Sequence, residues 1–395
     1  MAFFSAPAAY RLPRLMLASA ILATVASCAT QPIAVSGERY QNPRKASRGV
    51  ANSLSSEFEK INAFSRSPSA ILIGPTVTLA SGEITKSGRE LQTFLLLDLK
   101  AMLGNISVDR LGGENDIASA NIITGHVVYE KPAQSAPEEA WFLVTLNIAK
   151  GSGNIVGEVA FRINARQFDP TPSRFFQNSP IFQHGVAYAT SSSTNLSGAS
   201  RKISPNIEIN ARIDRGVIAY EAGQFADSEK IFREVAVRDT ENMAALSGIY
   251  QSAIALGKKA EAEQALDQLI DAGIRRGNLS FKFLFRVRSA EFRDDIEISS
   301  QYSQWINRAA HRLAKSNLCL SVEGHSSLTG SAEFNKDLSF KRAERVTQHL
   351  IRANPQLKSR IKGVGYGFAK NIVGSGTDDA KDAIDRRVEF RLHQC

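Results

Sequence analysis

One helix near the C-terminus restricts the fold most, because its apolar face carries a cation. At about 100° per residue, residues 330–350 place their apolar side chains on one half of a helical wheel. Those side chains are Phe334, Leu338, Ala343, Val346 and Leu350. Asn335 and Arg342 fall within the same half, about 20° apart. An arginine on a buried face requires an anionic partner, which is either an internal acid such as Glu323 or the carboxylate of a ligand.

The segments around this helix predict a small α/β domain. Apolar residues alternate with polar ones over 279–285, which is typical of a strand. Helical spacing follows over 298–313, and a second strand over 318–325 ends in the turn Gly324-His325-Ser326-Ser327. The chain closes with Asp385-Arg386-Arg387 and a last apolar strand.

These motifs resemble the OmpA-like peptidoglycan-binding domain in their order and spacing. The resemblance covers residues 278–395 and implies a βαβαβ fold that binds the diaminopimelate of peptidoglycan stem peptides. It implies that Arg342 holds the ligand's carboxylate and that Asn335 supports the site. The family's acid in the turn, which holds the ligand's ammonium, is replaced here by Ser327, and the usual Asn before the two arginines is Asp385. Half of the charge recognition is therefore present.

The N-terminus has the features of a secretory signal peptide over residues 1–27. Arg11 and Arg14 precede a short apolar run, and Val25-Ala26-Ser27-Cys28 follows it. That ending resembles the lipobox of bacterial lipoproteins, which implies lipidation at Cys28 and, with Ala29, an outer-membrane protein facing the periplasm. Ordinary secretion with a chance cysteine is the alternative.

The predicted compartment is oxidising, and only Cys319 and Cys395 remain there besides Cys28. We therefore predict a possible disulfide between them. It requires Cα atoms within about 7 Å of each other, which the sequence leaves open.

The segment between the signal peptide and residue 170 is predicted to contain a tether and an α+β module. Residues 28–66 form the tether, with a short helix suggested by Leu54, Phe58, Ile61 and Phe64. Residues 67–170 contain one helical stretch and several alternating strands. This module resembles the periplasmic domain of curli-type secretion lipoproteins, and an unrelated α+β adaptor is the alternative. The segment between its strands is too short and polar for a pore-forming hairpin.

A linker and a helical region complete the multidomain chain. Residues 171–207 are rich in Ser and Pro and are predicted to be a flexible linker. Residues 208–275 resemble tetratricopeptide repeats, because a shift of 34 residues brings Gly223 onto Gly257 and Phe232 onto Leu266. The prediction is a groove that binds an unidentified periplasmic protein. A plain four-helix segment is the alternative.

Composition excludes several functions. The net charge of +9 arises from 48 Lys and Arg against 39 Asp and Glu spread along the chain, so nucleic acid is not an expected partner. Six His and three Cys without ligand spacing predict no metal site, and no catalytic or cofactor motif occurs. We predict a non-enzymatic outer-membrane lipoprotein that links the membrane to peptidoglycan and scaffolds a protein partner. The alternative is an accessory subunit of a secretion, pilus or polysaccharide-export machine whose OmpA-like domain no longer binds the wall.

Overall fold

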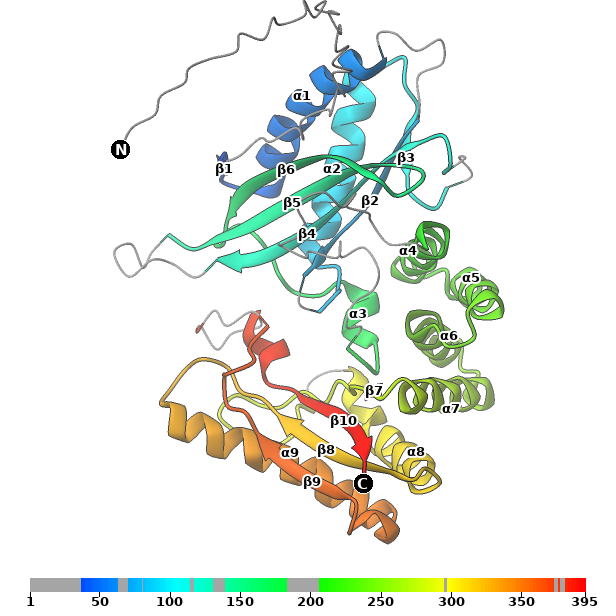
Figure 1. Cartoon of the computed structure of the whole chain (residues 1–395), viewed down its shortest axis with the longest axis vertical. Coiled ribbons are helices and arrows are strands. Elements are labelled where there is room, and N and C mark those ends of the chain that lie inside the picture. The colour runs from blue at the N-terminus through cyan, green and yellow to red at the C-terminus, as the bar shows by residue number, and fades with distance from the viewer. Residues whose placement is uncertain are drawn as a thin grey trace, which may run out of the picture. The chain divides into compact units, whose positions relative to one another are not determined.

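The computed structural model describes most of the chain beyond its N-terminal segment (Figure 1). The described residues are 37–62, 70–79, 81–113, 117–130, 139–182, 206–294, 297–372, 376 and 381–395. The predicted signal peptide, Cys28 and Phe64 lie outside them. Among the described helices, none is both long enough and apolar enough to cross a membrane.

The first part of the chain builds a six-stranded sheet. Its strands are β1 (Arg39–Tyr40), β2 (Ile71–Thr78), β3 (Val108–Arg110), β4 (Asn121–Glu130), β5 (Trp141–Lys150) and β6 (Ile155–Asn164). They lie in the order β1-β6-β5-β4-β2-β3, with β4, β5 and β6 antiparallel and β2 parallel to both neighbours. The expected α+β arrangement of strands and a helix in this module is present, and its hairpin turns at Gly153, whose φ is 86°.

Helices α1 (Pro43–Asn62) and α2 (Lys86–Met102) cover one face of this sheet (Figure 1). Both contribute to one core with the residues of β2, β4, β5 and β6 that point to that face. The predicted helix at Leu54 and Phe58 is the second half of α1, but the prediction of a tether is wrong for residues 43–48, because α1 already begins at Pro43. Ala46, Val50 and Ala51 are almost fully buried there. Their small side chains allow α1 to lie close against α2. Most other residues of this part of α1 are polar, so the buried face is hard to recognise in the sequence.

The predicted flexible linker is also wrong at its start. Residues 171–182 are ordered and include α3 (Arg174–Asn178). Phe175 and Phe176 are buried, and Phe175 stacks on Phe232 with ring centroids 5.4 Å apart. The proline-containing segment 171–182 is therefore a packed connection and not a flexible linker. Residues 183–205 lie outside the described part of the chain.

Four helices follow: α4 (Ile207–Glu221), α5 (Phe225–Arg238), α6 (Met243–Ala255) and α7 (Lys259–Arg275). They stack in chain order (Figure 1). Phe232, which the 34-residue shift pairs with Leu266, is fully buried, and so is Leu266. Gly216 and Gly248 both face the Phe232 ring, and a Cβ on Gly216 would lie 2.8 Å from its Cζ. The four helices agree with the predicted region, and their assignment to tetratricopeptide repeats stays a prediction.

We expect Gly248→Ala to lower the free energy of unfolding by up to about 2 kcal/mol. The added methyl group would overlap the Phe232 ring, and overpacking of a core typically costs about 1–3 kcal/mol. The gain in helix propensity of about 1 kcal/mol offsets part of this. Urea unfolding measures the change. Gly104→Ala, in the turn after α2, is the control for the added methyl group alone, because a Cβ on Gly104 meets nothing within 4 Å. Equal effects of the two changes would contradict the packing described.

A buried ion-pair cluster joins α2 to α4. The Arg89 guanidinium lies 3.0 Å from Asp214 Oδ1 and 3.1 Å from Glu221 Oε2. Gln92 Nε2 donates to the second oxygen of Asp214. Burial by itself lowers the pKa of Arg89, but Asp214 and Glu221 raise it above its usual value. Arg89 therefore stays charged and holds the layer of helices α4–α7 against α2 on the first sheet.

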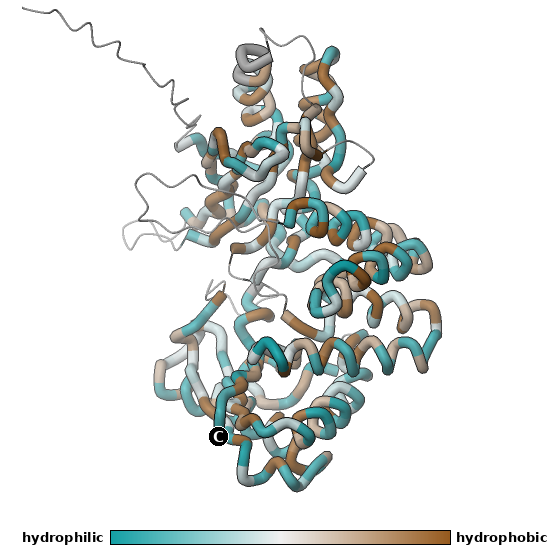
Figure 2. The backbone as a smooth tube through the Cα atoms, turned by 45° about the vertical axis from the view of Figure 1, so that its right-hand side comes forward, coloured by the Kyte–Doolittle hydropathy of each residue, from teal (hydrophilic) through white to brown (hydrophobic). Residues whose placement is uncertain are grey.

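The C-terminal domain contains a four-stranded sheet in the order β7-β10-β8-β9. Its elements are β7 (Asn278–Leu279), η1 (Glu297–Gln301), α8 (Tyr302–Ala314), β8 (Leu318–Gly324), α9 (Ala332–Ala353), η2 (Pro355–Leu357), β9 (Ile361–Gly365), η3 (Lys381–Asp385) and β10 (Val388–Gln394). The helix-and-sheet alternation agrees with the predicted α/β class. Figure 2 shows hydrophobic and hydrophilic residues alternating along the helices, as expected where one face of each is buried.

The predicted strand over 279–285 is mostly wrong. Only its first residue belongs to β7, and the rest makes isolated bridges, one between Phe281 and Ile181 and one between Phe285 and Phe292. Phe281, Phe283 and Phe285 are fully buried, and so nearly is Lys282 between them. Both the apolar and the polar positions of this segment are buried. The alternation of apolar and polar residues therefore does not indicate a strand with one exposed face here.

A row of ion pairs joins α7 to α8. Arg308 contacts Glu263 and lies 2.8 Å from Asp267 Oδ2, and Arg312 donates to Asp271 Oδ1 over 2.7 Å. At the start of the row, Trp305 Nε1 donates to the Tyr250 hydroxyl over 2.8 Å. The helical layer and the C-terminal domain are thus connected by side chains as well as by the chain itself.

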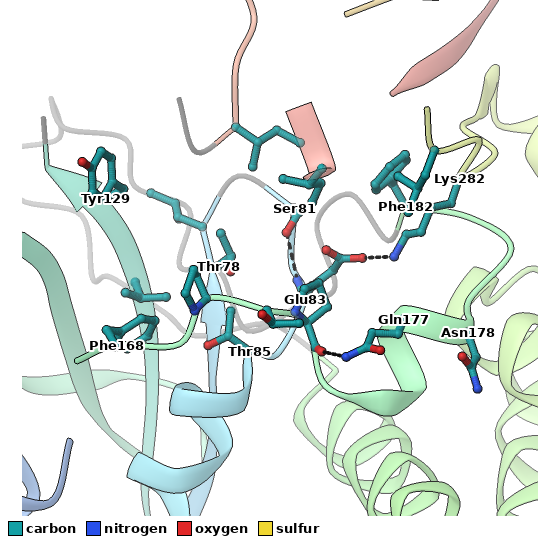
Figure 3. A pocket seen from close by; sticks show the side chains of 18 of the residues that line it. Thr78, Ser81, Glu83, Thr85, Tyr129, Phe168, Gln177, Asn178, Phe182 and Lys282 are labelled. Atoms are coloured by element: carbon teal, nitrogen blue, oxygen red, sulfur yellow. Dashed lines mark hydrogen bonds and ion pairs between the residues drawn. The ribbon is translucent and has the colours of Figure 1, made fainter. Parts of the chain in front are cut away.

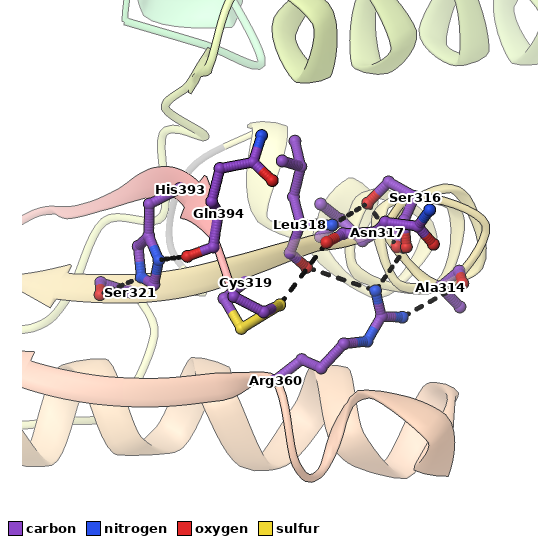
Figure 4. Close-up of a disulfide and its surroundings, with 11 residues drawn as sticks. Ala314, Ser316, Asn317, Leu318, Cys319, Ser321, Arg360, His393 and Gln394 are labelled. Carbon is purple, nitrogen blue, oxygen red and sulfur yellow. Dashed lines mark hydrogen bonds between the residues drawn. A yellow bond between two sulfur atoms is a disulfide. The ribbon is translucent and has the colours of Figure 1, made fainter.

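A disulfide joins Cys319 on β8 to Cys395 after β10 (Figure 4). The Cα–Cα distance that the sequence left open is 4.9 Å. The two strands are antiparallel neighbours in which Cys319 lies opposite His393. Arg360 lies nearby and donates to the carbonyls of Ala314, Ser316 and Leu318.

Candidate functional site

The candidate site surrounds the turn that follows β8, residues 325–331. Gly324 ends the strand directly against α9, where a side chain would overlap the Ser339 carbonyl oxygen. The backbone N–H of His325 donates to the Arg387 carbonyl, and that of Ser326 donates to the Gly367 carbonyl. The residue before β10 and the segment after β9 therefore hold the turn in place.

Asn335 holds the second half of this turn. Its Nδ2 donates to the carbonyls of Thr329 and Ser331, both over 3.0 Å. Ser331 is also the N-cap of α9 and accepts from the backbone N–H of Phe334. Asn335 is 1% exposed, so its position on the buried face agrees with the helical wheel. Phe334 was expected on the same face but is 39% exposed.

Arg342 is completely buried on the same helix face. Its guanidinium donates to three backbone carbonyls, through Nη1 to His325, through Nε to Ser289 and through Nη2 to Arg286. The distances are 3.0, 3.0 and 3.2 Å. The guanidinium also lies over the Phe285 ring, 5.3 Å from its centroid. Arg342 thus connects the candidate turn to the segment before η1.

Two of those carbonyls come from a tight loop, residues 286–289, which sequence reasoning missed. Its Ser289 N–H donates to the Arg286 carbonyl, and Arg288 has a φ of 53°, a conformation that few side chains adopt. The neighbouring Glu291 pairs with Arg345 on α9 at 2.6 Å. The sequence shows only a mostly polar stretch of six residues between Phe285 and Phe292. It does not show which side chain donates hydrogen bonds to these carbonyls.

Glu323, the acid that the sequence offered as an internal partner for Arg342, forms ion pairs with Lys370 at 3.3 Å and Arg391 at 3.9 Å. Glu323, His325 and Glu389 also bring three potential metal-ligand atoms within 4.8 Å of one another. Glu389 is paired with Arg387 at 2.6 Å. Because cations already neutralise both carboxylates, we assign no metal to this cluster.

Ser327 and Asp385 occupy the two positions that depart from the family pattern. Ser327 is 5% exposed in the turn and offers a hydroxyl without charge. Asp385 is fully buried, and its Oδ1 accepts from the backbone N–H of Ile372. The structure therefore gathers Ser327, Asn335 and Arg342 around one turn, where Arg342 reaches the His325 carbonyl. Cys28 lies outside the described residues.

Residues 292–385 match the OmpA family. The C-terminal domain is OmpA-like. The OmpA-like domain includes α8, β8, α9 and β9, together with the candidate turn, Asn335 and Arg342. The 286–289 loop lies before the matched residues.

Two curated relatives are similar to part of this chain. Outer membrane porin F of Pseudomonas fluorescens is 38% identical over 68 residues, which are 17% of this chain and 20% of the relative. A peptidoglycan-associated lipoprotein of Legionella pneumophila is 32% identical over 98 residues, 25% of this chain and 54% of the relative. The chain thus spans about a fifth of the porin and about half of the lipoprotein. These relatives are envelope proteins by name, and their similarity is to the OmpA-like domain.

Among solved structures, the peptidoglycan-associated lipoprotein from Burkholderia pseudomallei is similar with 24% identity and a TM-score of 0.25. The match covers 28% of this chain and 89% of that one. An outer membrane protein from Borrelia burgdorferi is 28% identical, with a TM-score of 0.22. It covers 29% of this chain and 86% of that one.

Proposed function

We propose that this protein is a non-enzymatic envelope protein that links the outer membrane to peptidoglycan through its OmpA-like domain. The observation that carries the proposal is the arrangement of Arg342 and Asn335 around the 325–331 turn within the region that matches the OmpA family. The name of the Legionella relative, a peptidoglycan-associated lipoprotein, supports the same ligand. The membrane end is assigned to a lipid on Cys28, and α4–α7 are assigned to a periplasmic protein partner.

The ligand is a carboxylate of the stem peptide, for which diaminopimelate is the candidate. A planar guanidinium suits a carboxylate, because two parallel N–H groups meet its two oxygens. Three of the five N–H donors of Arg342 are engaged by carbonyls in this structure. Binding therefore proceeds with displacement of the 286–289 loop, whose two carbonyls the ligand carboxylate replaces. Such an exchange, together with the uncharged Ser327, makes binding weaker than in a family member with the acid.

We expect Ser327→Asp to strengthen co-sedimentation with purified sacculi by about tenfold to a hundredfold. The added carboxylate supplies a charge-assisted hydrogen bond to the ligand's ammonium, which contributes roughly 1.5–3 kcal/mol. The fraction of protein in the pellet, measured against sacculus concentration, gives the affinity. Ser359→Asp adds the same charge at an exposed position of the same domain and is the matched control.

A thermal melt of each variant establishes that the domain is folded, since position 327 is buried. Ser327→Asn, which keeps the shape of Asp without its charge, should not gain affinity. If neither the wild type nor a folded Ser327→Asp chain sediments with sacculi, the wall-binding proposal fails.

The second candidate is an accessory subunit of an envelope machine in which the OmpA-like domain binds protein. The occupied guanidinium of Arg342 favours it, because carbonyls of the chain already fill positions where a ligand carboxylate would bind. Failure of sedimentation together with an in vivo crosslink through α4–α7 would support this candidate.

A further inference from the structure

A cavity of about 650 Å³ is lined by none of the residues of the candidate turn. Its walls come from the end of β2, the segment before α2, β4, residues 168–172, α3, the segment around residue 282, the start of η1, and Ile372 and Ile384. Apolar side chains make up most of the wall, including Leu79, Val127, Phe168 and Ile298. Cavities that bind small molecules have volumes of about 300–1,000 Å³ and mainly apolar walls with a few placed polar groups.

The polar groups of this cavity centre on an ion pair between Glu83 and Lys282 (Figure 3). The two residues are 199 positions apart, and their side chains are 1% and 4% exposed. Lys282 Nζ also donates to the Phe176 carbonyl and lies 5.1 Å from the centroid of the Phe182 ring. Lys282 is therefore well provided with partners.

Glu83 is not equally satisfied. Its Oε1 accepts from Lys282, but its Oε2 is buried and receives no hydrogen bond from the described residues. A buried carboxylate oxygen without a donor is unfavourable, because the group has lost its water without replacement. One strong acceptor, Oε2, is thus enclosed by protein in a residue that lines an apolar cavity, and a ligand would meet it after a rotation of the Glu83 side chain.

The charges of the pair select the kind of donor. Lys282 neutralises Glu83, so a charged ligand group next to Glu83 Oε2 would gain no net attraction from the pair. Arg293 and Glu297, which also line the cavity, add one charge of each sign. A ligand carboxylate would in addition face the Glu83 oxygen. A neutral hydroxyl or amide N–H avoids both costs and supplies the missing hydrogen bond.

We propose that this cavity binds a neutral amphiphile, whose apolar body contacts the cavity walls and whose hydroxyl or amide group donates to Glu83 Oε2. Nothing in this site depends on cell-wall binding, since Glu83 and Lys282 take no part in the 325–331 turn.

The test uses the full chain with 1-aminoanthracene, an aromatic amine that becomes more fluorescent in apolar surroundings. Competition with 1-decanol and with decanoate at neutral pH then compares a donor head with a charged acceptor of the same chain length. We expect a rise in fluorescence with the wild type, and displacement by 1-decanol at about a tenfold lower concentration than by decanoate.

Two variants locate the binding. Leu79→Trp adds bulk to the cavity wall and should abolish the rise in fluorescence. Leu97→Trp, on α2 and 55% exposed, is the matched control and should leave it unchanged. Replacing Glu83 by Gln and Lys282 by Met together removes both charges at similar size, and should abolish the preference for 1-decanol.

Three results would overturn the proposal: no rise in fluorescence with a folded wild type, equal binding by the two Trp variants, or equal displacement by 1-decanol and decanoate. If the double variant fails to fold, the two Trp variants and the two competitors still test whether the cavity binds a neutral amphiphile.

Discussion

Arg342→Ala is expected to lower the free energy of unfolding of this protein by about 3–5 kcal/mol. The change takes a donor from the carbonyls of Arg286, Ser289 and His325, although the Ser289 N–H still donates to Arg286. His325 is fully buried, and an unsatisfied buried group costs about 1–3 kcal/mol. It also opens a cavity beneath Phe285, because Arg342 is among the largest fully buried side chains. Equilibrium unfolding in urea, followed by circular dichroism, measures the loss.

Arg352→Ala is the matched control, because Arg352 lies on the same helix and is exposed. We expect a change there of less than about 0.5 kcal/mol. A change at Arg342 as small as this would mean that the three hydrogen bonds contribute little. The expected loss also affects the wall-binding experiment, since failure of Arg342→Ala to sediment would reflect stability as well as ligand contact. The gain expected from Ser327→Asp does not share this ambiguity.

Reduction of the disulfide between Cys319 and Cys395 is expected to cost about 4 kcal/mol. The two cysteines are 76 residues apart, and closing a loop of this length removes that much conformational entropy from the unfolded chain. The same loss is expected for the double change Cys319→Ser with Cys395→Ser. Unfolding in urea with and without dithiothreitol measures it.

The double variant also provides the control, because dithiothreitol should not alter its stability. A wild-type transition that stays unchanged when both thiols have been released, as judged by alkylation, would contradict the expectation. So would a double variant as stable as the oxidised wild type.

The sequence predicts the C-terminal domain well where side chains repeat with a regular period. The burial of Asn335 and Arg342 follows from the helical wheel alone, because 3.6 residues per turn place both on the apolar side. Strand β8 follows from its apolar residues and the turn after it. These features depend on the spacing of residues close together in the chain, so a short stretch of sequence is enough to predict them.

The contacts of Arg342 could not be predicted in the same way. They depend on the carbonyls of Arg286 and Ser289, more than 50 residues away. Because every residue has a backbone carbonyl, the sequence does not show which carbonyls accept from Arg342. The ion pair between Glu83 and Lys282 has the same cause, since it joins two segments that meet only in the folded chain. Lys282 stands between phenylalanines in what appeared to be an alternating strand. Its burial requires Glu83, which periodicity does not reveal.

Residues near 276 look like a boundary in the sequence, yet the row of ion pairs between α7 and α8 crosses it. A fragment beginning at β7 would leave Arg308 and Arg312 without Glu263, Asp267 and Asp271. The apolar core also continues from α6 and α7 into α8 and the four-stranded sheet. The OmpA-like domain of this chain is consequently not an exchangeable cassette. Transplanting it into another protein, or recombining it during evolution, would require the helices before it to move as well.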